Sequence, residues 1–216
     1  MAVKVLVADD DALVRAGLRM VLASDPGLHL VGEATNGAEA VLRTRQHRPD
    51  IVLMDLQMPV LDGVEATRQI TMLEDNPAVL ILTTFHLDSY VLDALRGGAR
   101  GYLLKDTAPR ELTRAIHMVV AGESVFSAEV TERLVQQLGK PADDHPATSA
   151  GQRLALLTDR ERAVADAIAD GLSNADIAAK LFLGEATVKT HVSRILTKTG
   201  TTNRVQVALL IYRTRA

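Results

Sequence analysis

The sequence predicts an α/β domain with a five-stranded, parallel, doubly wound sheet, followed by a small all-α domain. Three observations support this prediction. Residues 1–120 alternate short apolar runs with segments of helical periodicity, and parallel neighbouring strands need such helical crossovers. The strands are apolar almost throughout, which is typical of a sheet covered on both faces. From Leu154 onward only short helical patterns occur.

The elements follow one another in a regular order. Strands are expected at 3–8, 28–34, 51–55, 79–83 and 101–104. The helices that alternate with them are expected at 13–23, 37–45, 64–73, 89–96 and 108–121. This order gives a five-stranded α/β domain over residues 1–122.

A connecting region follows the α/β domain. A helix is expected at 127–138, between an N-cap at Ser127 and a stop at Gly139. Residues 139–151 are rich in Gly, Pro, Ser and Asp and offer little to bury, so they are expected to form a flexible linker. We therefore assign 123–153 to a linker helix and flexible linker, and 154–216 to the helical domain.

The composition excludes several classes of protein. The chain has no cysteine, which excludes a disulfide framework, a thiolate zinc site and a cysteine nucleophile. Its longest apolar run, 207–212, is far shorter than the roughly 20 residues of a membrane-spanning helix. The apolar start runs into three aspartates, unlike a secretory signal. We expect a cytoplasmic protein with no membrane partner.

Charge is unevenly distributed along the chain. Residues 1–139 carry 13 basic and 19 acidic side chains, whereas residues 140–216 carry 11 and 8. From Ala186 onward there are six basic side chains and no acidic one. Such a basic C-terminal segment is typical of a surface that binds a polyanion.

Polar residues stand where the expected strands end. Asp9 and Asp10 follow the first strand, Asp55 ends the third, Thr83 ends the fourth, and Lys105 follows the fifth. The carboxyl ends of parallel strands meet at one edge of the sheet, where ligands bind in such folds. Crowded carboxylates favour a cation among them, and oxygen ligands suit Mg²⁺. Alternatively, the aspartates after the first strand only cap a helix, but that leaves the hydroxyl group and the lysine unexplained.

The all-α domain contains the outline of a helix-turn-helix. Thr158 and Glu161 form a capping box that begins a helix at 159–170. Ser173 caps a helix at 174–181, and a short turn with a glycine leads into a last helix of the motif at 186–199.

The helix at 186–199 has two unlike faces. At about 100° per residue one stripe is apolar and is expected to be buried, and it consists of Val188, Val192, Ile195 and Leu196. The opposite face carries cations and hydroxyl groups without any acid, and it consists of Lys189, Thr190, Ser193, Arg194 and Thr197. Such groups can reach base edges and phosphates in a major groove. An ordinary solvated face is the alternative, although it usually mixes both signs of charge.

Five motifs occur in order along the α/β domain: Val5-Leu-Val-Ala-Asp-Asp10, Pro49-Asp-Ile-Val-Leu-Met-Asp-Leu-Gln-Met-Pro59, Asp62-Gly63, Leu82-Thr-Thr84 and Gly101-Tyr-Leu-Leu-Lys105. Together they make residues 1–122 resemble the receiver domain of bacterial response regulators. The resemblance implies a flavodoxin-like sheet and Mg²⁺-dependent phosphorylation by a sensor histidine kinase.

The resemblance assigns a role to each polar residue at the sheet edge. Asp55 would accept the phosphoryl group, and Lys105 would pair with one of its oxygens. Thr83 and Tyr102 would form the switch, with the Thr83 hydroxyl group turning to the phosphoryl group and Tyr102 changing rotamer with it. Four groups would hold Mg²⁺: Asp9, Asp10, Asp55 and the main-chain carbonyl of Gln57.

Four motifs occur in the helical domain: Leu157-Thr-Asp-Arg-Glu161, Gly171-Leu-Ser-Asn174, Asp176-Ile-Ala178 and Thr187-Val-Lys-Thr-His-Val192. They resemble the DNA-binding domain of LuxR-type regulators, and the whole chain resembles the NarL/FixJ subfamily. The resemblance implies that three side chains face bases, namely Lys189, Thr190 and Ser193. Three others would lie nearer to phosphates, namely Thr187, Arg194 and Lys198.

Four positions depart from the family patterns, and the sequence leaves their effects open. Asp11 stands where many relatives have histidine, and Asp106 stands where proline is frequent. Gly184 replaces the usual hydroxyl cap of the last helix, and Thr199 replaces leucine near its end.

The favoured interpretation is a response regulator, not an enzyme, that dimerises on phosphorylation and binds promoter DNA, with RNA polymerase as a further partner. A phosphatase with an aspartyl-phosphate is disfavoured, because Gln57 occupies the place of the second acid that its chemistry needs. A ligand-sensing regulator is disfavoured, since the chain has only six aromatic residues to line a pocket. A phosphorylation-independent member of the same family is the alternative.

A second apolar stripe occurs near the C-terminus. It consists of Val205, Ala208, Leu209 and Tyr212, which share one face of a helix at 205–212. We expect this face either to contribute to a dimer of DNA-binding domains or to pack inside its own domain.

Overall fold

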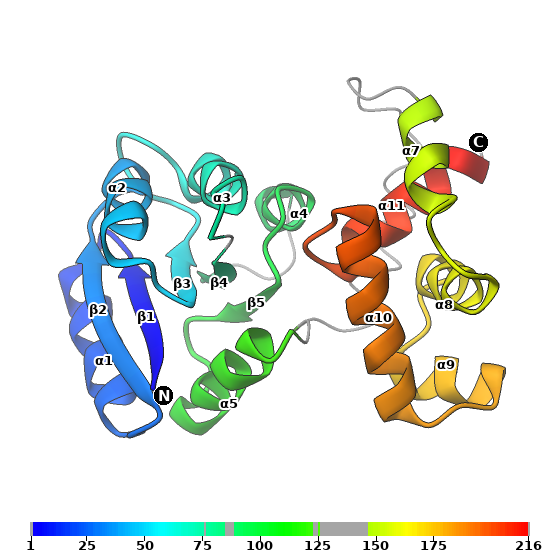
Figure 1. Cartoon of the computed structure of the whole chain (residues 1–216). Helices are drawn as coiled ribbons and strands as arrows, with labels where there is room; N and C mark the ends of the chain where they lie inside the picture. The colour runs from blue at the N-terminus through cyan, green and yellow to red at the C-terminus, as the bar shows by residue number, and fades with distance from the viewer. Residues whose placement is uncertain (1, 76, 85–88, 123–124, 126–146, 216) are drawn as a thin grey trace. The chain divides into compact units, whose positions relative to one another are not determined.

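The computed structural model describes residues 2–75, 77–84, 89–122, 125 and 147–215. The chain divides into two compact units, Met1–Val125 and Phe126–Ala216 (Figure 1). The helix expected at 127–138 lies outside the described residues. No helix among the described residues is both long and apolar enough to cross a membrane.

The N-terminal unit contains one five-stranded sheet. Its strands are β1 (Val3–Ala8), β2 (Leu28–Ala34), β3 (Ile51–Asp55), β4 (Ala78–Thr83) and β5 (Gly101–Leu104). They pair in parallel in the order β2-β1-β3-β4-β5, which is the flavodoxin-like order. The predicted doubly wound sheet is therefore confirmed. The direction of winding changes between β1 and β3, which is where open α/β sheets bind ligands.

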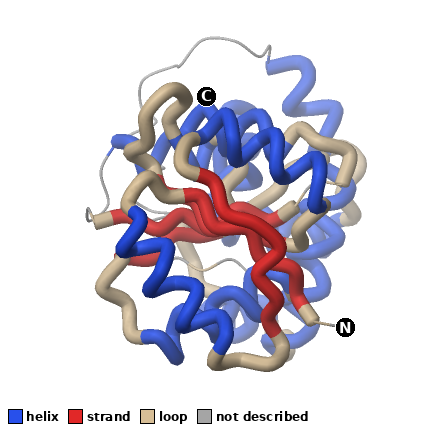
Figure 2. The backbone as a smooth tube through the Cα atoms, turned by 90° about the vertical axis from the view of Figure 1, so that its left-hand side faces the viewer, coloured by secondary structure: helices blue, strands red, loops and turns tan. Residues whose placement is uncertain are grey.

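Helices cover both faces of this sheet (Figure 2). On one face α1 (Ala12–Ala23) contacts α5 (Pro109–Val120). The other face is covered by α2 (Gly37–His47), α3 (Gly63–Thr71) and α4 (Ser89–Arg96). Because both faces are covered, every residue of β3 and β4 is buried.

The described part of the C-terminal unit, residues 147–215, consists of helices around one apolar core. They are α7 (Ala147–Leu154), α8 (Asp159–Ala169), α9 (Asn174–Leu181), α10 (Glu185–Thr199) and α11 (Arg204–Arg215). The capping box of Thr158 and Glu161 begins α8 as predicted, and Ser173 caps α9. Residues 182–184 join α9 to α10, which confirms the predicted helix-turn-helix.

The structure corrects one part of the expected flexible linker, 139–151. Its last residues belong to α7, which packs against α10 and α11. Ala150 and Leu154 are one helical turn apart and each is only 3% exposed. The sequence pattern missed this helix because its residues are mostly short, so that a single alanine and a single leucine carry its buried face.

The apolar stripe on α11 is divided between the interior and the surface. Val205 and Ala208 are buried in the core of their own unit, whereas Leu209 is half-buried and Tyr212 is 37% exposed. Packing inside the unit therefore accounts for the first half of the stripe, and a role of the second half in a dimer stays a prediction.

Candidate functional site

The register of β1 against β3 brings the acidic residues together. Ala8 pairs with Met54, so Asp9 and Asp55 follow at the same level of the sheet. One carboxylate oxygen from each of Asp9, Asp10 and Asp55 lies within 4.8 Å of the others. Asp9 and Asp55 are buried, and Asp10 is exposed.

Lys105 lies between two of these carboxylates. Its Nζ is 2.7 Å from Oδ2 of Asp9 and 3.0 Å from Oδ2 of Asp55. The main-chain N–H of Lys105 donates to the carbonyl of Thr83, which fixes the residue beside the end of β4. Strand ends separated by 96 positions, from Asp9 to Lys105, therefore form a single charged site.

Burial and charge act against each other in this site. Burial raises the pKa of Asp55, while the hydrogen bond and charge of Lys105 partly oppose the rise. Burial alone would lower the pKa of Lys105, but hydrogen bonds to Asp9 and Asp55 outweigh it, so the pKa of Lys105 is raised. The lysine is therefore firmly cationic at neutral pH and balances part of the carboxylate charge.

Thr83 and Gln57 lie at the same edge of the sheet, whereas Tyr102 lies inside β5, where it pairs with Ile81, two positions before the level of Thr83. Thr83 is buried at the end of β4, and Tyr102 is half-buried on β5. Gln57 is exposed, and its main-chain N–H donates to the Asp55 carboxylate. The metal-binding role of the Gln57 carbonyl and the switch roles of Thr83 and Tyr102 stay predictions.

Gly63 explains why the Asp62-Gly63 pair stands so near the site. Asp62 caps α3 by accepting a hydrogen bond from the N–H of Glu65 at 2.8 Å. A Cβ at Gly63 would lie only 1.9 Å from the carbonyl oxygen of Asp55. The first turn of α3 can therefore approach the main chain of Asp55 only because residue 63 has no side chain.

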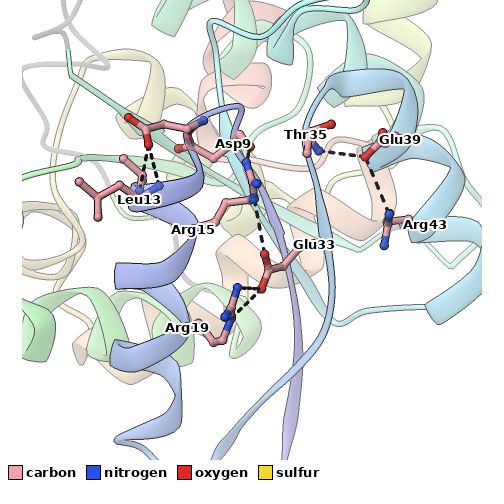
Figure 3. A network of polar contacts seen from close by, with 10 residues as sticks. Asp9, Leu13, Arg15, Arg19, Glu33, Thr35, Glu39 and Arg43 are labelled. Carbon is pink, nitrogen blue, oxygen red and sulfur yellow. Dashed lines mark hydrogen bonds and ion pairs between the residues drawn. The ribbon is translucent and has the colours of Figure 1, made fainter.

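An arginine that the sequence analysis missed supports the β1–α1 turn. Nη1 of Arg15 donates to the main-chain carbonyl of Asp9 at 2.8 Å, and Nε of Arg15 lies 3.4 Å from Oε2 of Glu33 (Figure 3). Glu33 also pairs with Arg19, 2.8 Å away. The sequence signal would have been an arginine within the first two turns of the helix that follows the aspartates.

Asp11 is the N-cap of α1. Its Oδ1 accepts hydrogen bonds from the N–H groups of Leu13 at 2.7 Å and Val14 at 3.4 Å. The N–H of Asp11 itself donates to Oδ1 of Asp9 at 3.0 Å. Asp11 thus shapes the turn that carries the other two aspartates.

The donor set fits a hard divalent cation. Three carboxylates converge, and at least one of them, on Asp10, faces solvent, from which water ligands can come. Mg²⁺ binds through one or two carboxylates, keeps several waters and pairs with phosphate oxygens.

The second candidate site is the exposed face of α10. Val188 and Ile195 are buried and Val192 and Leu196 pack against the same core, as predicted. All of the residues expected to meet DNA are exposed: Thr187, Lys189, Thr190, Ser193, Arg194 and Lys198. Gly184 caps α10 without a side-chain hydrogen bond, because it has none to offer.

Lys198 has a partner that the sequence did not reveal. Its Nζ lies 2.7 Å from Oε2 of Glu161, whose side chain is only 4% exposed. The hydrogen bond from Lys198, together with the N–H of Thr158, lowers the pKa of Glu161 from 4.5 to about 2. Lys198 therefore compensates a buried carboxylate, in addition to any contact with phosphate.

Each of the two units matches a known protein family. Residues 5–117 match the response regulator receiver domain, and residues 155–211 match bacterial regulatory proteins of the luxR family. The chain is a two-component response regulator with a LuxR-type DNA-binding domain. This family consists of transcriptional regulators rather than enzymes, and the predicted NarL-like subfamily is confirmed.

Relatives extend over nearly the whole chain. The transcriptional regulatory protein YxjL of Bacillus subtilis is 39% identical over 211 residues, which cover 98% of this chain and 95% of that protein. The DNA-binding transcriptional activator DevR/DosR of Mycobacterium tuberculosis is 39% identical over 207 residues, 96% of this chain and 93% of that protein. The crystal structure of the response regulator ChrA, from a heme-sensing two-component system, has 36% identity and a TM-score of 0.53 over 99% of this chain and 98% of that one.

Proposed function

We propose that a sensor histidine kinase phosphorylates Asp55 in a Mg²⁺-dependent reaction, and that this modification controls dimerisation and sequence-specific DNA binding. The observation that carries the proposal is the position of Lys105, whose Nζ bridges the buried carboxylates of Asp9 and Asp55. Such a cation is suited to a phosphoryl group on Asp55, because a new anion there needs a partner inside the protein.

The chemistry of transfer rests on positioning and charge. An oxygen of Asp55 attacks the phosphorus atom of a phosphohistidine, the P–O bond forms, and the P–N bond to the kinase breaks. Bound Mg²⁺ would supply positive charge to the phosphoryl oxygens, with Asp9, Asp10, Asp55 and the Gln57 carbonyl as its protein ligands. Lys105 would exchange its contact with Asp55 for one with a phosphoryl oxygen.

The signal would leave the site through two side chains on neighbouring strands. Thr83 is buried at the end of β4, beside the main chain of Lys105. Its hydroxyl group would bind the phosphoryl group, and Tyr102 on β5 would change rotamer. The altered surface would favour a homodimer, so that two DNA-binding domains read two related half-sites of promoter DNA.

The recognition helix α10 would contact both bases and phosphates, through different side chains. Lys189, Thr190 and Ser193 would face bases, whereas Thr187, Arg194 and Lys198 would lie nearer to phosphates. Lys189→Ala should weaken binding to the preferred site by about 1–3 kcal/mol and leave binding to random DNA unchanged. Lys198→Ala should weaken binding to both kinds of DNA and lower the salt dependence of binding by about one counterion.

A regulator that meets promoter DNA would act in the cytoplasm, with RNA polymerase as a further partner. The alternative within the same family is a regulator that binds DNA without phosphorylation. It shares the DNA-binding face and differs only in the use of Asp55.

The first test is phosphorylation by a small donor. Acetyl phosphate with Mg²⁺ should add one phosphoryl group, seen as a mass increase that is stable in acid and lost in base. Asp55→Asn should remove the increase, while Asp62→Asn serves as the control for a nearby acid outside the cluster. Modification of Asp55→Asn at the normal rate would contradict the assignment.

The second test identifies the DNA. Fragments bound by the phosphorylated protein are selected from genomic DNA, and their shared sequence is measured as a duplex against random DNA. A preferred duplex with two related half-sites is the expected result, whereas equal affinity for all fragments would contradict sequence-specific binding.

A further inference from the structure

The C-terminal end of the recognition helix α10 is held by an arginine from another helix. Arg153 of α7 donates from Nε to the carbonyl of Thr199 at 2.5 Å and from Nη2 to the carbonyl of Gly200 at 3.0 Å. The last carbonyls of a helix have no partner within the helix, and a cation beside them also opposes the negative end of the helix dipole. Arg153 thus satisfies and neutralises this end of α10.

The same turn of α10 buries a polar side chain. Thr199 is only 1% exposed. Its hydroxyl group donates to the carbonyl of Ile195 at 2.7 Å and shares a hydrogen bond with Thr201 at 2.8 Å. A threonine buries little apolar surface, so this turn depends on its hydrogen bonds, including those that reach it from Arg153.

The helix that carries Arg153, α7, is packed firmly against its own unit. Leu154 and Ala150, the neighbours of Arg153 on α7, are buried in the core of the C-terminal unit. The helix contacts both α10 and α11. Arg153 lies outside the residues 155–211 that match the luxR family, so this anchor is separate from the matched motif.

We propose that Arg153 is a positioning residue for DNA recognition. By fixing the last turn of α10 it sets the angle of the whole helix, and with it the depth at which Lys189 and Ser193 enter the groove. The inference rests on the proposed DNA contacts of α10. Its guanidinium group is engaged with main-chain carbonyls, so it acts on DNA through the helix and not by meeting phosphate.

The test is a salt titration of the full chain carrying Arg153→Gln, on the selected duplex and on a random duplex of the same length. Affinity for the selected duplex should fall about tenfold, the size of one lost base contact. Affinity for random DNA and the salt slope should stay unchanged, because no phosphate contact is removed. Arg153→Lys keeps the charge and one donor group, so it should lose about threefold.

Two controls separate positioning from other roles. Arg213→Gln on α11 removes the same charge from an exposed arginine and should leave the ratio of the two affinities unchanged. Thermal melting of each variant ensures that binding is measured on folded protein, and Arg153→Lys serves if Arg153→Gln does not fold.

Two results would overturn the inference. Equal losses on both duplexes with a smaller salt slope would show that Arg153 meets phosphate. A lower melting temperature with unchanged affinities would show that the contact only stabilises the fold. Failure of the unsubstituted chain to prefer the selected duplex would instead contradict the proposed function.

Discussion

The two functional sites of this chain are held in place by different kinds of contact. In the receiver domain, main-chain pairing of β1 with β3 sets Asp9 beside Asp55, and pairing of β4 with β5 leads to Lys105. In the DNA-binding domain, all the residues proposed to face DNA share one helix, and side chains from α7 and α8 hold the end of that helix. The residues of a site that strand pairing brings together can be predicted from the sequence motif. The side chains that hold α10 come from distant parts of the sequence, so the motif does not predict them.

The largest expected effect breaks the main-chain packing of the receiver site. Gly63→Ala places a Cβ 1.9 Å from the Asp55 carbonyl oxygen, so the turn must move. Overpacking against the main chain should destabilise the receiver domain by about 3 kcal/mol. Calorimetry would show this as a lower unfolding temperature of the receiver domain. The matched control is Gly17→Ala on α1, where a Cβ meets nothing within 4 Å.

The control should behave in the opposite way. A helical alanine is more stable than glycine by about 0.5–1 kcal/mol, so Gly17→Ala should raise the same transition slightly. Similar changes from both substitutions would mean that the packing of Gly63 against Asp55 does not set the stability of this site.

The next effect concerns the side-chain contact in the DNA-binding domain. Lys198→Met leaves the carboxylate of Glu161 buried without its cation, which should destabilise this domain by about 1–3 kcal/mol. The control is Lys180→Met, which breaks a pair with Asp170 between half-exposed side chains and should lose less than about 1 kcal/mol. Addition of Glu161→Gln to Lys198→Met should restore part of the lost stability. If the double substitution recovers no stability, the ion pair does not stabilise the domain.

The contact between Lys198 and Glu161 should also make the stability of the DNA-binding domain depend on pH in acid. The pKa of Glu161 is lowered from 4.5 to about 2, so its ionised form stabilises the folded domain at every pH above 4.5. This contribution should be lost progressively as the pH falls from 4.5 towards 2. Denaturation measured across this range should show a smaller acid sensitivity for Glu161→Gln, and equal slopes for the two proteins would contradict the lowered pKa.

The smallest expected effect concerns backbone strain beside the receiver site. Val60 has φ +68 and is 86% exposed, although a β-branched residue is disfavoured in the left-handed region. Val60→Asn should therefore stabilise the receiver domain by about 1 kcal/mol. Met72→Asn, at an exposed residue with φ −88, is the control and should give no such gain.

The sequence was sufficient to predict the positions of the residues at the ends of the strands. The strands and the acidic cluster follow from apolar runs that end in Asp, Thr and Lys, because parallel strands must share one carboxyl edge. The caps of α8 and α9 were also predictable, since Thr158 and Ser173 act on residues within one turn. Local spacing carries such information directly.

The contacts that hold α10 were not predictable. Arg153 and Thr199 are separated by 46 positions, and Glu161 and Lys198 by 37. Periodicity describes one helix at a time and says nothing about which side chains meet between helices. The helix that carries Arg153 was itself hidden, because its short residues resemble a linker.

Phosphorylation of Asp55 is proposed to control DNA binding. The most direct measurement is the affinity of the full chain for the selected duplex, before and after treatment with acetyl phosphate and Mg²⁺, beside the same pair for Asp55→Asn. The account predicts a treatment-dependent gain in affinity for the unsubstituted chain and none for Asp55→Asn. An equal affinity before and after stoichiometric phosphorylation of Asp55 would contradict it and favour the phosphorylation-independent regulator.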